Sequence, residues 1–225
     1  MVGALTLYQT TIGKKVVMAV TGLILFAYVF VHMLGNLKVF SGPDYLNAYG
    51  VFLREVGYPL LAHESVLWIA RVVLLVSVGL HIWAAYQLTR LDLAGRPVHY
   101  QDRKYLASSF AARTMRWSGV LLALFIVYHI LHLTTGTAHG SYREGDIYNN
   151  VVSGFRNPIV SLVYIVSQVA LALHLYHGVW SLSQTMGWRS SVNNSLWKGF
   201  ATVSAVLIGA GNISIPLAVL VGIVR

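Results

Sequence analysis

The sequence predicts an all-α integral membrane protein with five transmembrane helices, forming a single domain over residues 1–225. Three observations support this fold class. Of the 225 residues 56% are hydrophobic and only 10% are charged, and the mean hydropathy is +0.65, a composition typical of membrane proteins. Five apolar segments are each long enough, at roughly 20 residues, to cross a bilayer. Polar connections separate these segments.

The first predicted span covers about residues 16–40, and we expect it to be retained because its apolar run is too long for a signal peptide. The sequence 41–44 breaks this helix, and Asp44 is expected to cap a short amphipathic helix over about 45–55 that lies along the membrane surface. The second and third spans are predicted at about 64–88 and 116–135, joined by a polar connection. Residues 136–157 read as a loop. The fourth span covers about 158–186, with Pro158 in its first turn, and the fifth, about 200–224, is expected to bend near Gly209 and Pro216.

The distribution of lysine and arginine predicts the orientation of the chain. With five spans, the N-terminal arm and the second and fourth connections share one side of the membrane. That side holds Lys14, Lys15, Arg90, Arg96, Arg103, Lys104, Arg113, Arg116, Arg189 and Lys198. The other side holds Lys38, Arg54, Arg143, Arg156 and Arg225. The positive-inside rule therefore places the N-terminus in the cytoplasm, and the net charge of +9 reflects topology and not nucleic-acid binding.

Each of the first four spans contains a histidine deep in its apolar segment. An imidazole in hydrocarbon is costly, so it needs a partner or a function. At about 1.5 Å rise per residue, His32 and His129 both lie about 10–12 Å inside the outer boundary. His81 and His174 share a second level, nearer the cytoplasm and roughly 10–15 Å from the first. The spacing therefore predicts two pairs, His32 with His129 and His81 with His174.

Two histidines that face each other at one depth are what a six-coordinate haem b requires. The chain has no cysteine, which excludes thiolate ligands and covalent haem attachment. Ligation by two histidines leaves no open iron position, so two such haems would serve electron transfer across the membrane. Small residues near the histidines would admit the macrocycle: Gly35, Gly79, Gly119 and Gly178. For each histidine alone, the alternative is an interhelical hydrogen bond.

His132, His177 and Arg71 are further candidates for the two haem sites. His132 and His177 lie one turn from His129 and His174, so spacing alone leaves open which of each two is the ligand. The other would be a neighbouring hydrogen-bonding group or a propionate partner. Arg71 lies about 15 Å outward of His81 along its helix, where it could bind haem propionates. Its alternative is an interhelical bond to a carbonyl. A haem-free transporter would need carboxylates within the spans, which have none away from their ends.

The whole chain resembles the five-helix, di-haem cytochrome b membrane subunit of succinate dehydrogenases and fumarate reductases. The motifs that carry the resemblance are Arg116-Trp-Ser-Gly119 with His129, His174 with Gly178, Trp180 and Gly187, Val31-His-Met-Leu-Gly35, and Gly79-Leu-His81. The resemblance implies one haem ligand on each of the first four spans. It selects His129 over His132 and His174 over His177. It also places Arg116 beside a haem, as a propionate partner or a neighbour of a ligand.

The resemblance also implies partners and cofactors. The chain would hold two haem b groups, while FAD and iron–sulfur clusters would lie in a flavoprotein subunit and an iron–sulfur subunit. These would dock at the cytoplasmic face of a bacterial inner membrane, against Arg90–Arg116 and Arg189. A further small membrane subunit or a homo-oligomer could complete the complex, and no dicarboxylate active site is expected in this chain. Some fumarate reductases of the family have a glutamate two residues before the fourth ligand. Ala172 at this position favours succinate oxidation.

A quinone, expected to be menaquinone, would accept the electrons near the outer side. Polar groups predicted there are Tyr45, Tyr49, Arg54, Glu55, His63 and Glu64, any of which could also be an ordinary interfacial residue. The alternative from the same chemistry is the haem subunit of a membrane nitrate reductase, formate dehydrogenase or hydrogenase. The ligand spacing of those proteins is absent from this sequence.

Overall fold

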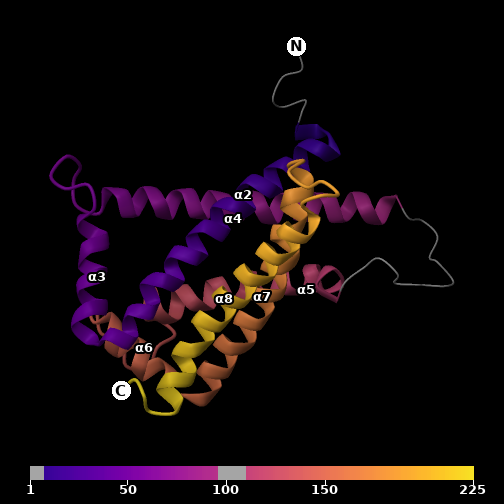
Figure 1. The fold of residues 1–225 in the computed structure, drawn as a ribbon. Helices are drawn as coiled ribbons and strands as arrows, with labels where there is room; N and C mark the ends of the chain where they lie inside the picture. The colour runs from indigo at the N-terminus through magenta and orange to yellow at the C-terminus, as the bar shows by residue number, and fades with distance from the viewer. Residues whose placement is uncertain (1–7, 96–109) are drawn as a thin grey trace.

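A computed structural model describes residues 8–95 and 110–225 as an assembly of helices (Figure 1). The helices are α2 (Thr11–Asn36), α3 (Pro43–Glu55), α4 (Ser65–Ala94), α5 (Phe110–His129), α6 (Ile147–Phe155), α7 (Pro158–Thr185) and α8 (Asn194–Leu220). A 3-10 turn, η1 (Leu37–Ser41), follows α2, and a π-helical turn, η2 (Ile130–Thr134), follows α5. Five helical segments are long and apolar enough to cross a membrane: Thr11–Ser41, Ser65–Ala94, Arg113–Thr134, Pro158–Thr185 and Asn194–Leu220. The predicted all-helical, five-span fold class is therefore confirmed.

Local sequence signals set the starts of the spans. The Thr10 side chain caps α2 by accepting a hydrogen bond from the Gly13 amide at 3.0 Å. The Asn157 side chain caps α7 in the same way, and Pro158 occupies the first turn as predicted. The prediction that Asp44 caps this helix is wrong, because α3 begins at Pro43 with Gly42 as its N-cap, which places Asp44 inside the first turn. Gly42, at φ 103°, supplies the sharp turn into this helix.

The bundle is organised around α7, which packs on α8 along one side and on α5 along another. The helix α2 crosses α7 and α8, and α4 packs chiefly on α2. One buried cluster forms around Met33, Leu175 and Ile208, and a second joins α6, α7 and the end of α8 around Phe155 and Tyr164. Because α4 reaches the bundle mainly through α2, its apolar side chains are the most exposed of the five spans.

The elements gather at two opposite ends of the molecule. In Figure 1 α3, α6 and the C-terminus lie at one end, while the connection between α7 and α8 lies at the other. Hydrogen bonds link elements within each end: Tyr148 of α6 donates to the Arg225 carbonyl at 3.1 Å, and the Tyr8 hydroxyl donates to Gln87 of α4 at 2.9 Å. The side of the membrane that each end faces remains a prediction.

The structure corrects the predicted loop over 136–157, because its second half forms α6. The Asp146 side chain caps this helix by accepting from the Asn149 amide. Its Tyr148, Val152 and Phe155 are buried against α7 and α8. Their three- and four-residue spacing is an amphipathic helical signal. In addition, α4 extends to Ala94, beyond the predicted end, and α8 runs without interruption through Pro216.

Candidate functional site

The outer pair of histidines joins α2 to α5. His32 lies in the second half of α2 and His129 is the last residue of α5. Their ring centroids are 5.8 Å apart and their planes are nearly perpendicular, at 86°. The ring of Tyr28 stacks on His32 at 5.3 Å. Both histidines are half-buried within the chain.

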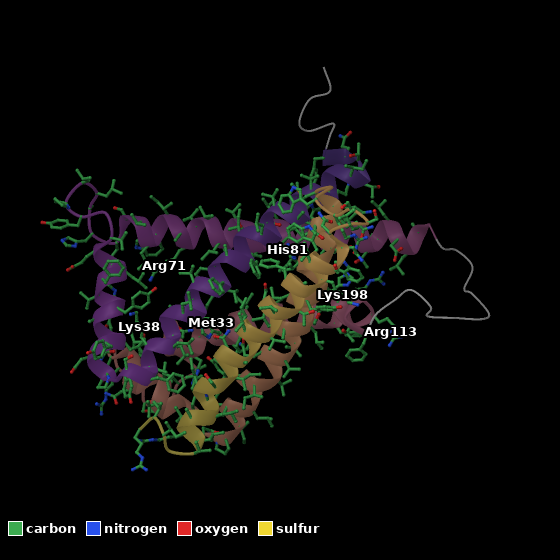
Figure 2. The ribbon with its side chains drawn as sticks, in the orientation of Figure 1. Met33, Lys38, Arg71, His81, Arg113 and Lys198 are labelled. Atoms are coloured by element: carbon green, nitrogen blue, oxygen red, sulfur yellow. The ribbon has the colours of Figure 1, made fainter. Side chains whose placement is uncertain are left out.

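The inner pair joins α4 to α7. His81 and His174 have ring centroids 6.3 Å apart, with an angle of 59° between the planes. Both are half-buried, and Figure 2 labels His81 where α4 crosses α2. The structure therefore brings together the same two pairs that the depth argument proposes.

These spacings fit a metal held between two imidazoles. With nitrogen–metal bonds of about 2.0 Å and a ring radius of about 1.1 Å, two imidazoles on opposite sides of one metal have centroids about 6.2 Å apart. The observed 5.8 and 6.3 Å bracket this geometry closely. Within residues 8–95 and 110–225, no group of three or more His, Cys, Asp or Glu residues could hold a metal ion. The donor set thus fits a metal whose other ligands come from a cofactor, as in haem.

Hydrogen bonds fix the tautomers of both inner histidines. The His81 Nδ1 lies 3.1 Å from the Met18 carbonyl, which can only accept, so Nδ1 carries the proton. The His174 Nδ1 lies 3.2 Å from the Ser118 hydroxyl, whose own proton goes to the Met115 carbonyl at 3.0 Å. The Nδ1 of His174 is therefore also the donor. In both rings Nε2 is left as the basic nitrogen, the arrangement typical of metal-binding histidines.

The two levels are separated by the same number of residues on two helices. On α2, Thr21 contacts His81 at 3.2 Å, and His32 follows eleven residues later. On α5, Ser118 contacts His174, and His129 again follows eleven residues later. Eleven residues correspond to about 16 Å along a helix axis. This distance is slightly more than the predicted separation of the two histidine levels, but a tilted helix covers less of the membrane's thickness over the same number of residues.

His132 is directed away from the outer pair. It is only 2% exposed, its Nδ1 lies 2.9 Å from the Tyr164 hydroxyl, and its ring stacks on Tyr128 and His139. A Cβ added at Gly154 would lie 2.9 Å from its Nε2, so that nitrogen faces the α6 backbone. There is no space beside it for a macrocycle.

The other residues predicted beside the haems are His177, Arg71 and Arg116, and each has different neighbours. The His177 Nδ1 is buried without a hydrogen-bond partner. Arg71 stacks over the Trp68 ring at 4.7 Å and interacts electrostatically with Tyr28, and Figure 2 places it on the side of α4 toward α2 and α3. Arg116 forms an ion pair with Asp92, with 2.7 Å between the nitrogen and the oxygen.

The predicted glycines divide into two groups. A Cβ at Gly178 would meet nothing within 4 Å, so there is open space one turn from His174 on the same helix face. Gly119 is 3.8 Å from the His174 ring by the same measure. Gly35 instead admits the Tyr49 ring of α3. A Cβ at Gly79 would also meet nothing within 4 Å. Because Gly79 lies two residues before His81, on the opposite face of α4, its role beside the macrocycle stays a prediction.

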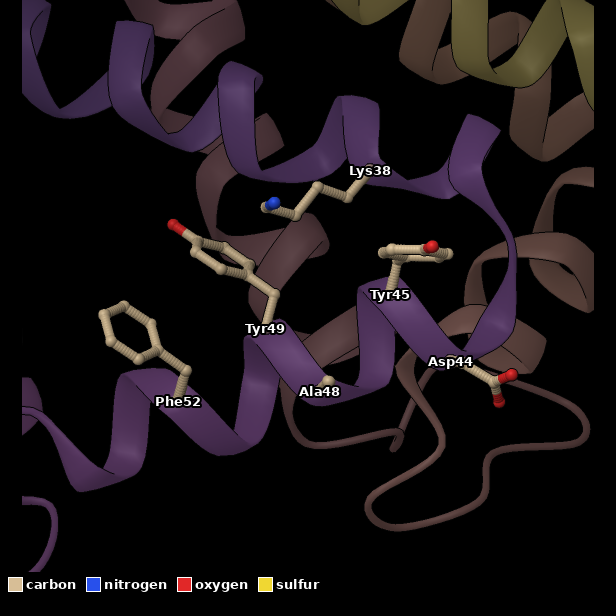
Figure 3. Close-up of a pocket in the computed structure, with 6 residues that line it drawn as sticks. All are labelled: Lys38, Asp44, Tyr45, Ala48, Tyr49 and Phe52. Carbon is tan, nitrogen blue, oxygen red and sulfur yellow. The ribbon is translucent and has the colours of Figure 1, made fainter.

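A cavity of about 590 Å³ lies beside α3. Its lining residues are Lys38, Asp44, Tyr45, Ala48, Tyr49 and Phe52 (Figure 3). The Lys38 ammonium lies 5.4 Å from the centre of the Tyr49 ring. Two of the predicted quinone residues, Tyr45 and Tyr49, thus line one cavity.

The other predicted quinone residues lie at the corner between α3 and α4. Arg54 pairs with Glu64 at 3.4 Å, and His63 stacks on Tyr58 at 4.2 Å. Glu55 is the last residue of α3. None of these four lines the cavity.

Sequence reasoning missed the hydroxyl residues that bind the histidines. Thr21, Ser118 and Tyr164 each contact the Nδ1 of a paired histidine. Thr21 and Ser118 each lie eleven residues before the next histidine on their own helix. This repeated spacing is a signal that the sequence contains.

Residues 104–212 match the sequence model of the succinate dehydrogenase/fumarate reductase transmembrane subunit family. The matched region includes α5 and α7, with His129 and His174. No curated protein and no solved structure shows significant similarity to the chain.

Proposed function

We propose that the chain is the haem-binding membrane anchor of a succinate dehydrogenase, because residues 104–212 match the succinate dehydrogenase/fumarate reductase transmembrane subunit family. The matched family consists of subunits of an oxidoreductase complex. The five apolar helices make the chain a multi-pass membrane protein. Two haems are supported by the two pairs of imidazoles, whose ring centroids lie 5.8 and 6.3 Å apart. His32 and His129 would ligate an outer haem b, and His81 and His174 an inner one.

The chain's own residues would hold these groups and tune them. The Met18 carbonyl and the Ser118 hydroxyl accept the Nδ1 protons of the inner ligands, which orients each ring and raises its basicity. When bound, each haem supplies a one-electron iron couple. Arg71 interacts electrostatically with Tyr28, whose ring stacks on His32, and its charge would suit a propionate of the outer haem. The buried, unpartnered Nδ1 of His177 offers a hydrogen bond beside the inner pair.

Electrons would enter from the inner side. A flavoprotein and an iron–sulfur subunit would dock at the cytoplasmic end, which holds Arg116, Arg189 and Lys198 among the described residues. Electrons would pass to the inner haem, then to the outer haem. The positive-inside rule supports this orientation, with the N-terminus in the cytoplasm of a bacterial cell.

The quinone, a menaquinone by the family resemblance, would bind in the cavity beside α3. Its volume of about 590 Å³ lies within the range of small-molecule sites. The hydroxyls of Tyr45 and Tyr49 and the Lys38 ammonium could bond the quinone carbonyls, and Phe52 would contact the ring. A Lys38→Ala variant should raise the KM for quinone while leaving the haem content unchanged.

Haem quantification on the purified complex tests the proposal. Pyridine haemochrome analysis should give two b-type haems per chain. Alanine at His81 or His174 should remove the inner haem, and alanine at His32 or His129 the outer one, leaving about one haem in each case. His63→Ala, which alters an exposed histidine stacked on Tyr58, is the control and should retain both. Absence of haem from the native complex would refute the electron-transfer function, and one haem would refute one of the pairs.

A further inference from the structure

We propose that Tyr164 is a positioning residue for the outer haem, and that it fixes His129 in the tautomer that can bind iron. The inference rests on the proposed ligation by His129 and adds a role for a tyrosine of α7 and for His132 of η2. His132, which stands one turn from the ligand, would act as the acceptor that sets the direction of the hydrogen bonds.

The Tyr164 hydroxyl lies between two imidazoles. It is 3.3 Å from the His129 Nδ1 and 2.9 Å from the His132 Nδ1. The tyrosine is 5% exposed and His132 is 2% exposed. Bulk water therefore does not supply alternative partners for this hydroxyl, and the three groups must satisfy one another.

Counting protons leaves two arrangements. A phenolic hydroxyl has one proton and can donate to only one imidazole. In the first arrangement Tyr164 donates to His132, and the His129 Nδ1–H donates to the phenolic oxygen. This leaves the His129 Nε2 unprotonated and able to bind a metal. In the second, Tyr164 donates to His129, whose proton then lies on Nε2 and blocks ligation.

The surroundings of His132 favour the first arrangement. Its ring stacks on His139 at 4.8 Å, and hydrogen bonds define the tautomer of that neighbour. The His139 Nδ1 accepts from the Ser141 amide at 3.1 Å, so its Nε2–H donates to the Asn150 carbonyl at 2.9 Å. These two bonds hold the His139 ring in place. Among the described residues no donor other than Tyr164 contacts the His132 Nδ1, so His132 can accept there and carry its own proton on Nε2.

Aromatic packing holds the Tyr164 ring in this position. The ring meets Phe155 at 4.7 Å and Phe125 at 5.0 Å, both edge to face. Phe155 comes from α6 and Phe125 from α5. The hydroxyl thus has little freedom to leave the space between the two imidazoles.

The direction of these bonds predicts an electronic effect. A ligand imidazole that donates its Nδ1–H to an acceptor becomes more basic and stabilises the oxidised metal. Chains of hydrogen bonds strengthen one another, so acceptance by His132 makes the Tyr164 oxygen a better acceptor from His129. Tyr164 should therefore lower the midpoint potential of the outer haem.

Redox titration of the Tyr164→Phe complex tests the inference. The variant should retain two haems, and the outer haem should shift to a higher midpoint potential with an altered low-spin electron paramagnetic resonance signal. The inner haem should be unchanged. The control is Tyr128→Phe, which removes a hydroxyl from the same cluster for which no hydrogen bond is found among the described residues. It should leave both haems as they are in the native complex.

A second variant covers the case in which Tyr164→Phe fails to assemble. His132→Phe keeps an aromatic ring beside Tyr128 and His139 and removes the Nδ1 acceptor, and it should shift the outer haem in the same direction. Two haems with His129 as a ligand, but with unchanged potential and spectrum in the variants, would overturn this inference alone. Loss of stability with no change in either signal would show a merely structural role and overturn it as well. A native complex without haem would instead overturn the proposed function.

Discussion

Gly154 of α6 should tolerate alanine poorly, because it lies directly against the histidine cluster. A Cβ built there would be 2.7 Å from the His132 Cε1 and 3.1 Å from the His139 Nε2. Gly199 of α8 provides the matched change, because a Cβ there would meet nothing within 4 Å. Both substitutions gain about 0.5–1 kcal/mol from helix propensity. Only Gly154→Ala also incurs an overpacking cost of about 1–3 kcal/mol.

The difference between the two variants isolates the clash. Gly199→Ala should be slightly more stable than the native protein, and Gly154→Ala should be less stable than Gly199→Ala by about 1–3 kcal/mol. Equilibrium unfolding in mixed detergent micelles measures both on one scale. If Gly154→Ala proved as stable as Gly199→Ala, α6 would not pack on His132 as described.

Three other predictions concern the polar contacts of the helix ends. The Asn149 amide that donates to Asp146 holds the pKa of that carboxyl below its ordinary value. Stability should therefore be constant above about pH 4 and fall as the carboxyl protonates at lower pH, and Asp146→Asn should flatten the unfolding free energy measured against pH. Asp92→Asn should cost under about 1 kcal/mol, because its ion pair with Arg116 is exposed, and salt titration should show the native pair weakening. Asn157→Ala removes the α7 cap and should cost about 1 kcal/mol in the same unfolding assay.

The sequence was sufficient to predict the five spans because length and hydropathy alone determine them. It also predicted which histidines would meet, because depth in a bilayer follows from position along each helix. The direction in which a side chain points does not follow from depth. The surroundings of His132 depend on α6 and on the π-helical turn η2, and the pattern of apolar residues does not reveal η2.

The missed helix α6 has a physical explanation. It is nine residues long, too short for the periodicity that identifies spans, and it forms because α3, α7 and α8 cover it. Gly79 was expected beside the macrocycle from its proximity in sequence to His81. Two residues along a helix turn the backbone to the opposite face, so that role stays a prediction.

The weak attachment of α4 to the bundle has a consequence for assembly in the cell. Among the described residues α4 packs chiefly on α2, yet its His81 faces His174 of α7. A group bound by both histidines would join α4 to the far side of the bundle, so its binding free energy would add directly to the free energy of folding. Cells short of that cofactor should then contain less of the subunit, because chains with a loosely held α4 would be open to membrane proteases. Cofactor supply would thus set how much of the complex accumulates.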